Sequence, residues 1–157
     1  MLTTVKNHVK GAVTVLFSDI AHIHTTSLNY GENMELTFQN CLSDARSLSM
    51  RYLPYCKGCN IVYWHSYISQ DPDFPSLINL IRNSYQENPY FQKLIDQDAE
   101  STYTNERRKM YPDRELFIKK AREDLLEQCA GLLLLANKGY RFQFYPGTPY
   151  SSIEYVN

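Results

Sequence analysis

The sequence has no long hydrophobic run, no biased tract and almost no net charge, and each absence excludes a class of protein. The apolar stretch AVTVLF at 12–17 is too short for a signal-peptide core or a membrane span, so we expect a cytoplasmic protein without a membrane partner. The formal charge of −1 gives no overall positive field, so DNA is not an expected partner and RNA would need a local basic patch. No repeat or linker divides the 157 residues, which predicts a single domain over 1–157.

Cysteine is scarce, with four in the chain. Cys56 and Cys59 form a CKGC pair, a spacing that fits either a redox site or half of a zinc site. A redox pair is expected where a strand turns into a helix, whereas this one precedes the strand-like NIVYW. A zinc site needs two more ligands, and only His65 follows at a suitable distance. Cys41 and Cys129 lie on the apolar sides of expected helices, so the sequence predicts four reduced thiols and no metal site.

Two apolar segments predict buried parallel strands. AVTVLFS at 12–18 and NIVYWH at 60–65 are rich in β-branched and apolar residues without alternation, which is typical of strands covered on both faces. Between them, apolar residues recur at helical spacing from Met34 to Tyr52 and predict a helix over 32–53 that ends before Pro54. A strand, a long helix and a second strand in this order favour parallel pairing of the two strands.

The rest of the chain predicts more helices and then two short strands. Helices are expected over 75–86, 89–107 and 113–136, with Asn88 and Asp113 as N-caps and Gly139 as a left-handed C-terminal stop. YRFQFY at 140–145 and YSSIEYV at 150–156 are expected strands. These elements predict an α/β fold of three layers, in which a mostly parallel sheet is flanked by helices.

Glu127 has the most unusual placement in the helix predicted over 113–136. It stands just before CAGLLLLA at 129–136, and Ala130 and Gly131 lie one turn further along the same face. Small residues beside a carboxylate leave room for a neighbouring backbone or for a ligand. Two interpretations stay open: Glu127 is solvated or paired with Lys119 or Arg122, or it lines a cavity and holds an ammonium group.

Three stretches carry a resemblance to a known family. They are VLFSDIAHIHTTSLNYG, a strand that ends in Asp with a polar loop and a Gly after it; EDLLEQCAGLLLL, a helix with a Glu and an apolar run; and PYSSIEYV. In this order they resemble segments of the tRNA-dependent cyclodipeptide synthases, where the second carries Tyr-x-x-x-Glu and the third Ser-Ser-Val-x-x-Tyr-His. The resemblance spans residue 12 to the end and implies a Rossmann-like domain, related to the catalytic domains of class I aminoacyl-tRNA synthetases.

The resemblance also implies functional residues. Glu127 matches the Glu that binds the substrate α-amino group, and Tyr155 matches the tyrosine of the last strand, so these two are the implied catalytic residues. Glu123 stands where the family has the first tyrosine of its motif, and no histidine follows Tyr155. The implied substrate-binding residues are Glu123, Ser18, Asp19 and His22.

The family joins two aminoacyl groups from aminoacyl-tRNA into a cyclic dipeptide, and it needs no ATP, metal or other cofactor. Its nucleophilic serine lies in an earlier strand–helix unit, and only eleven residues precede 12–17 here. We therefore expect a shortened protein, and the sequence leaves open whether it is an aminoacyltransferase. Ser18, at the carboxyl edge of a strand, is a candidate surrogate nucleophile. The alternative is a non-catalytic module of the same fold that binds aminoacyl-tRNA, a small amine or a protein.

Basic residues suited to RNA are few. QNCLSDARSLSMRYL at 39–53 stands where the family has its long, Arg-rich helix; it holds Arg46 and Arg51, and Lys57 follows it. The resemblance implies that these three residues bind tRNA. Without the earlier strand, one edge of 12–18 would be uncovered, which favours a homodimer that covers it.

Overall fold

A computed structural model describes residues 12–141 and 150–156. Its strands β1 (Thr14–Phe17) and β2 (Asn60–Tyr63) are parallel neighbours, with Thr14 opposite Asn60 and Phe17 opposite Tyr63. Between them lie α2 (Ile23–Ser27), a 3-10 turn η1 (Leu28–Tyr30), the long helix α3 (Met34–Tyr52) and a second 3-10 turn η2 (Leu53–Tyr55). The predicted parallel pairing and the helix between the strands are confirmed, but both strands are only partly buried and not covered on both faces as expected.

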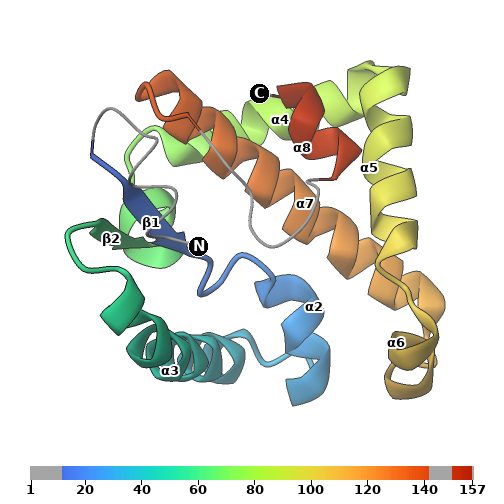
Figure 1. Cartoon of the computed structure of the whole chain (residues 1–157). Coiled ribbons are helices and arrows are strands. Elements are labelled where there is room, and N and C mark those ends of the chain that lie inside the picture. Colours follow the sequence, from blue (N-terminus) through green and yellow to red (C-terminus); the bar gives the residue numbers. More distant parts are fainter. Residues whose placement is uncertain (1–11, 142–149, 157) are drawn as a thin grey trace.

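Helices make up most of the fold (Figure 1). After β2 come a π-helical turn η3 (His65–Ser69), α4 (Phe74–Glu87), α5 (Pro89–Ser101), α6 (Asn105–Met110), α7 (Arg114–Asn137) and α8 (Ser151–Val156). α7 runs through the middle of the molecule, and α2, α4, α5 and α8 pack against it. The fold is thus mostly helical with a small parallel sheet, and the three-layer arrangement stays a prediction.

Several helix ends lie where local signals placed them. Asp113 caps α7 by accepting from the N–H of Leu116 at 2.9 Å, and Asn88 caps α5 by accepting from the N–H of Tyr90 at 3.0 Å. Gly139 follows the end of α7 with a φ of 82°, a left-handed conformation that costs glycine little. The predicted caps of both helices and the stop after α7 are confirmed.

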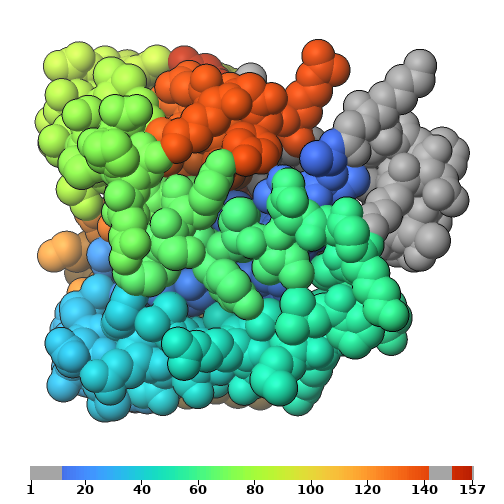
Figure 2. Space-filling model, turned by 90° about the vertical axis from the view of Figure 1, so that its left-hand side faces the viewer, coloured from blue at the N-terminus to red at the C-terminus, as the bar shows by residue number. Residues whose placement is uncertain are grey.

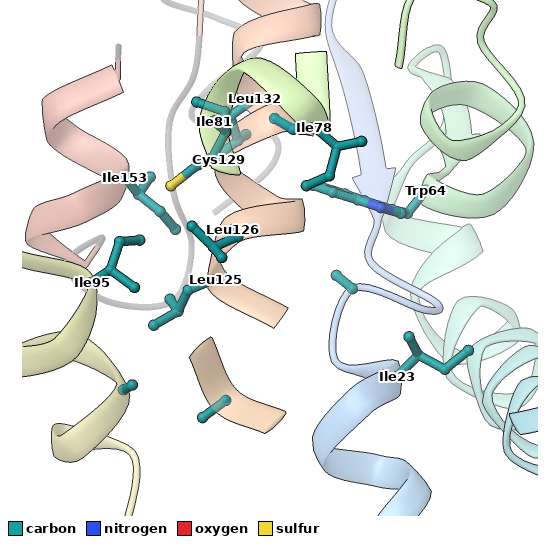
Figure 3. Close-up of a cluster of buried hydrophobic side chains, with 14 of the residues drawn as sticks. Ile23, Trp64, Ile78, Ile81, Ile95, Leu125, Leu126, Cys129, Leu132 and Ile153 are labelled. Atoms are coloured by element: carbon teal, nitrogen blue, oxygen red, sulfur yellow. The ribbon is translucent and has the colours of Figure 1, made fainter. Parts of the chain in front are cut away.

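The core surrounds α7 (Figure 3). One buried cluster joins Leu125, Leu126, Cys129 and Leu132 of α7 to Ile95 of α5, Ile153 of α8 and Trp64. Burial raises the pKa of the Cys129 thiol to about 12, so this cysteine stays protonated and packs as an apolar residue. α7 is therefore buried on several sides, as its sequence suggested.

The position of Trp64 explains why a glycine stands at position 131, one turn after Glu127. A Cβ on Gly131 would lie 2.5 Å from Trp64 Cζ2 and 2.9 Å from Ile68 Cγ2, closer than carbon atoms can pack. The indole ring fills the space opposite Gly131. At this position the room along α7 is taken by the protein's own side chain and not by a ligand.

The expected helix over 89–107 is wrong in its length. α5 ends at Ser101, and a new helix, α6, begins at Asn105. The side chain of Thr104 accepts from the N–H of Arg107 at 3.4 Å and so caps α6. An N-cap requires a non-helical backbone at the capping residue, and this interrupts the helix.

The expected strand over 150–156 is wrong, because these residues form the helix α8. Asp98 of α5 is buried and its Oδ2 accepts from the N–H of Ser152 at 2.7 Å, which satisfies a donor of the first helical turn. Ile153, on the same short helix, is buried in the core. The expected strand over 140–145 lies mostly outside the described residues, and neither Tyr140 nor Arg141 is in a strand.

Figure 2 shows the face that carries the sheet, with α3 below, the segment after β2 in the middle and the C-terminal end of α7 above. Among the described residues β1 pairs with β2 alone, so a homodimer through its other edge stays a prediction. In residues 12–141 and 150–156, no helix combines the length and the apolar character that a bilayer crossing requires.

We expect the purified protein to contain far less than one zinc ion per chain. The described part of the chain holds no group of three or more His, Cys, Asp or Glu side chains arranged for a metal, although Cys56 and Cys59 are both described. Elemental analysis checks this, and a chelator should leave the melting temperature unchanged. Stoichiometric zinc that the chelator removes would contradict the prediction.

Candidate functional site

A buried carboxylate holds α2 against α7. Asp124 of α7 is only 2% exposed. Its Oδ1 accepts from the N–H of His24 at 2.8 Å, and its Oδ2 accepts from the N–H and hydroxyl of Thr25 at 3.0 and 2.6 Å. Both N–H groups belong to the first turn of α2, where backbone donors have no partner inside the helix. Asp124 thus fixes the segment that follows β1.

Glu127 lies one turn after Asp124 and contacts the same helix. Its Oε1 is 3.0 Å from His24 Nε2, and the side chains of Glu127 and His24 are 25% and 19% exposed. The expected partner Arg122 instead places its Nε 2.7 Å from Asp96 Oδ1. The structure therefore pairs Glu127 with a histidine.

Burial and neighbouring groups act in opposite directions on the pKa values of His24 and Asp124. Burial disfavours the charged form of His24, but the hydrogen bond and charge of Glu127, aided by Asp124, outweigh it and raise the pKa of His24 above its ordinary value. Burial also raises the pKa of Asp124, while its bonds to Thr25 limit the rise. His24 thus carries a positive charge over a wider pH range than a free histidine.

His22, an implied substrate-binding residue, belongs to the same cluster. Gln128 of α7 donates from Nε2 to the carbonyl of Ala21 at 2.8 Å and lies 3.2 Å from His22 Nδ1. Desolvation lowers the pKa of His22, against the attraction of Asp124. The structure therefore brings His22 and Glu127 to neighbouring positions along the contact of α2 with α7.

Asp19 joins the ends of the two strands. Its Oδ1 accepts from the N–H of Ile20 at 3.1 Å and of His65 at 3.0 Å, so the carboxylate links the residues after β1 to those after β2. Arg46 of α3 and Asp19 both line a surface hollow of about 250 Å³ at these strand ends. Ser18 is exposed, and within residues 12–141 and 150–156 no base hydrogen-bonds to its hydroxyl.

Glu123 and Tyr155, two other implied residues, make contacts of their own. Glu123 Oε2 is 3.1 Å from Arg82 of α4, in an ion pair at the surface. Tyr155 is on a helix and not on the expected strand, and its hydroxyl accepts from Asn88 Nδ2 at 3.1 Å while its ring stacks on Phe91 of α5. The contacts that the structure gives Tyr155 therefore anchor α8 to α5.

The implied tRNA-binding residues lie on or after α3. Arg46 and Arg51 belong to that helix and Lys57 follows it, and all three are exposed. Their exposure suits contact with a phosphate backbone, but each also fits a solvated surface charge.

Sequence reasoning missed two residues of the cluster. His24 lies in the polar loop that the resemblance had singled out, two residues after His22. Asp124 directly precedes the apolar Leu125 in a helix with a long apolar run. An acidic residue at a buried position needs a hydrogen-bonding partner, so the sequence already indicated that Asp124 has one. The signal for Asp124 was thus present, whereas its partner in α2 was not visible.

Comparison with known proteins places the fold. No protein-family model and no curated protein matches the chain. The structure is similar to that of a CDPS, a cyclodipeptide synthase, from Fluoribacter dumoffii, with a TM-score of 0.86 and 18% sequence identity. The match covers 98% of this chain and 70% of that one. At this identity the likeness establishes the fold, so the chain has a cyclodipeptide-synthase fold and the resemblance is confirmed at that level.

Proposed function

We propose that this protein binds aminoacyl-tRNA and that Glu127 holds the α-ammonium group of the aminoacyl end. The fold supports the proposal, since the similar solved structure is a cyclodipeptide synthase. In the family resemblance Glu127 matches the residue that binds the α-amino group, and this match supports the proposal. The observation that carries the proposal is that, among the described residues, Glu127 contacts a histidine and no permanent cation.

A titratable partner leaves Glu127 available to a ligand. Arginine and lysine keep their charge well above neutral pH, whereas a histidine loses its charge at a lower pH than they do, even when its pKa is raised as that of His24 is. Three cations of α4 and α7 are already paired with other acids: Arg122 with Asp96, Arg82 with Glu123 and Lys120 with Glu32. A partly buried carboxylate that an imidazole can release is suited to an ammonium group, because a charge-assisted hydrogen bond is stronger away from bulk water.

Two forms of this function are distinct: aminoacyl transfer to a cyclic dipeptide, and binding alone. The isolation of the Ser18 hydroxyl from any described base favours binding alone, since a serine nucleophile needs a neighbouring base. In either form Arg46, Arg51 and Lys57 would contact the tRNA. Incubation with radiolabelled aminoacyl-tRNA separates the two, because only the transferase releases labelled cyclic dipeptide.

Glu127→Gln should weaken binding of aminoacyl-tRNA about ten- to a hundredfold. The amide keeps the shape of the carboxylate but removes the charge, and a charge-assisted hydrogen bond contributes roughly 1.5–3 kcal/mol. The melting temperature should change by a few degrees at most. Filter binding with aminoacylated and deacylated tRNA measures the effect, and the variant should lose the preference for the aminoacylated form.

Glu115→Gln is the matched control, because it makes the same change on an exposed residue of the same helix. It should bind as the wild type does. If Glu127→Gln binds both forms of tRNA as tightly as the wild type, Glu127 is a solvated helix residue and the proposal fails.

A further inference from the structure

One oxygen of Glu127 is already occupied. Oε1 meets His24 Nε2, whereas no described group hydrogen-bonds to Oε2. Both side chains keep a flank open to solvent. An ammonium group that arrives from solvent therefore meets a carboxylate that the protein's own histidine holds.

The backbone of His24 is fixed on both sides. Its N–H donates to Asp124, and its carbonyl accepts from the hydroxyl of Ser27 at 2.6 Å. Ser27 is fully buried and Asp124 nearly so. The contact with Glu127 is made by the imidazole, so the ring can be released from the carboxylate without breaking these backbone bonds of α2.

Negative charge acts on His24 from α7. Glu127, Asp124 and Glu123 together outweigh the burial of the ring and raise the pKa of His24. If Glu127 were neutralised by another cation, most of this attraction would be lost while the burial remained. The ring would then favour its uncharged form.

Among the described residues, elements other than α7 bring few titratable groups close to His24. On the turn of α2 itself, His22 faces Asp124, and Arg107 of α6 acts on His22. α3 brings the thiol of Cys41, which faces Thr26 and whose pKa is raised by burial, so it stays neutral. The carboxylates of α7 therefore dominate the charge of His24.

We propose that protonated His24 occupies the site at Glu127 that would bind an ammonium group, and that an amine ligand binds there by displacing His24. The inference rests on the proposed function, because it takes Glu127 as the ammonium site. In the exchange, N–H groups of the ligand donate to Glu127 in place of His24 Nε2–H. The imidazole then gives its Nε2 proton to solvent, so one proton leaves for each amine bound and no other bond changes.

The test uses the whole chain and leucinol, a primary amine that stays protonated from about pH 5.5 to about 8. The Kd of leucinol should rise about tenfold for each pH unit between the pKa of His24 in the free protein and its lower pKa in the complex, and be constant above the free value, because protonated His24 and the ligand compete for one carboxylate. His24→Ala keeps the backbone hydrogen bond to Asp124 but removes the imidazole that contacts Glu127. It should bind leucinol with no pH slope, and more tightly than the wild type at low pH.

A second measurement needs no variant. Nitrogen-detected titration of the imidazoles by NMR should show a raised pKa for His24 in the free protein and a lowered one at saturating leucinol. His65, whose ring packs against Phe38, serves as the control in the same spectra and should not move. N-acetylated leucinol has no ammonium group and should leave both histidines unchanged.

The outcomes separate the two proposals. If leucinol binding depends on Glu127 but has the same pH profile in His24→Ala, or if His24 keeps its raised pKa in the complex, the exchange is wrong and the proposed function stands. If neither leucinol nor aminoacyl-tRNA binds, or if Glu127→Gln changes nothing, both are wrong.

Discussion

Asp124→Ala should lose about 4 kcal/mol of unfolding free energy, which lowers the melting temperature by roughly 10 °C in a chain of this length. The substitution removes the acceptor of three hydrogen bonds, from the N–H of His24 and from the N–H and hydroxyl of Thr25. The two backbone donors would stay buried without a partner, at about 1–3 kcal/mol each. Urea denaturation followed by circular dichroism measures the loss.

Asp113→Ala is the control for the loss of an acidic cap. Asp113 accepts one bond at the exposed start of α7, so this variant should lose only about 1 kcal/mol. Asp124→Asn keeps one acceptor oxygen and should fall between the two. A loss for Asp124→Ala no larger than that for Asp113→Ala would show that the buried carboxylate does not hold α2.

The same residue makes stability depend on pH. Burial raises the pKa of Asp124 above its value in the unfolded chain, so the folded protein binds more protons than the unfolded one between the two pKa values. The stability that this pKa difference adds is fully present below the unfolded pKa and is lost as the pH rises through the folded one, whereas the hydrogen bonds to α2 remain. Asp124→Asn should remove this part of the profile in urea titrations at a series of pH values.

Gly131→Ala should destabilise the protein by about 3 kcal/mol, although alanine is a better helix residue than glycine by roughly 1 kcal/mol. The added Cβ would lie 2.5 Å from Trp64 Cζ2 and 2.6 Å from Cη2, in the middle of the core. The indole would have to leave its position. A thermal or urea melt measures the change, and its sign alone decides whether packing or helix propensity dominates.

Trp64→Phe provides the rescue, because phenylalanine lacks the two ring atoms that the new Cβ would meet. Alone it should destabilise the core through the space it leaves. The double variant Gly131→Ala with Trp64→Phe should lose less than the two single losses together, by about 1 kcal/mol or more. Strict additivity would contradict a direct contact between the two side chains.

Features that depend on near neighbours in the chain were predictable from the sequence. The apolar segments around β1 and β2, and the helical period of α3 between them, were sufficient for the parallel strand pair. The caps at Asn88 and Asp113 and the stop at Gly139 follow from the chemistry of single side chains and of glycine. These preferences act within a turn or two, so no distant contact overrides them.

The helix α8 could not be predicted from the local sequence pattern. In a stretch of seven residues the strand and helix periods differ by little, so the pattern of 150–156 did not decide between them. The deciding contact is Asp98, a buried carboxylate more than fifty positions earlier, which accepts from the N–H of Ser152. Tertiary structure made this segment a helix, and with it moved Tyr155 to the surface of α5.

The candidate site, too, was predictable from the sequence only in part. The resemblance singled out Glu127 from the sequence alone, and the apolar run at 129–136 indicated that the helix after it is buried. Periodicity indicates which face of a helix is apolar, but it does not say which loop packs across from it. His24, 103 positions away, reaches Glu127 because Asp124 fixes the start of α2. Only the tertiary structure decided that the partner of Glu127 is a side chain able to lose its charge and leave.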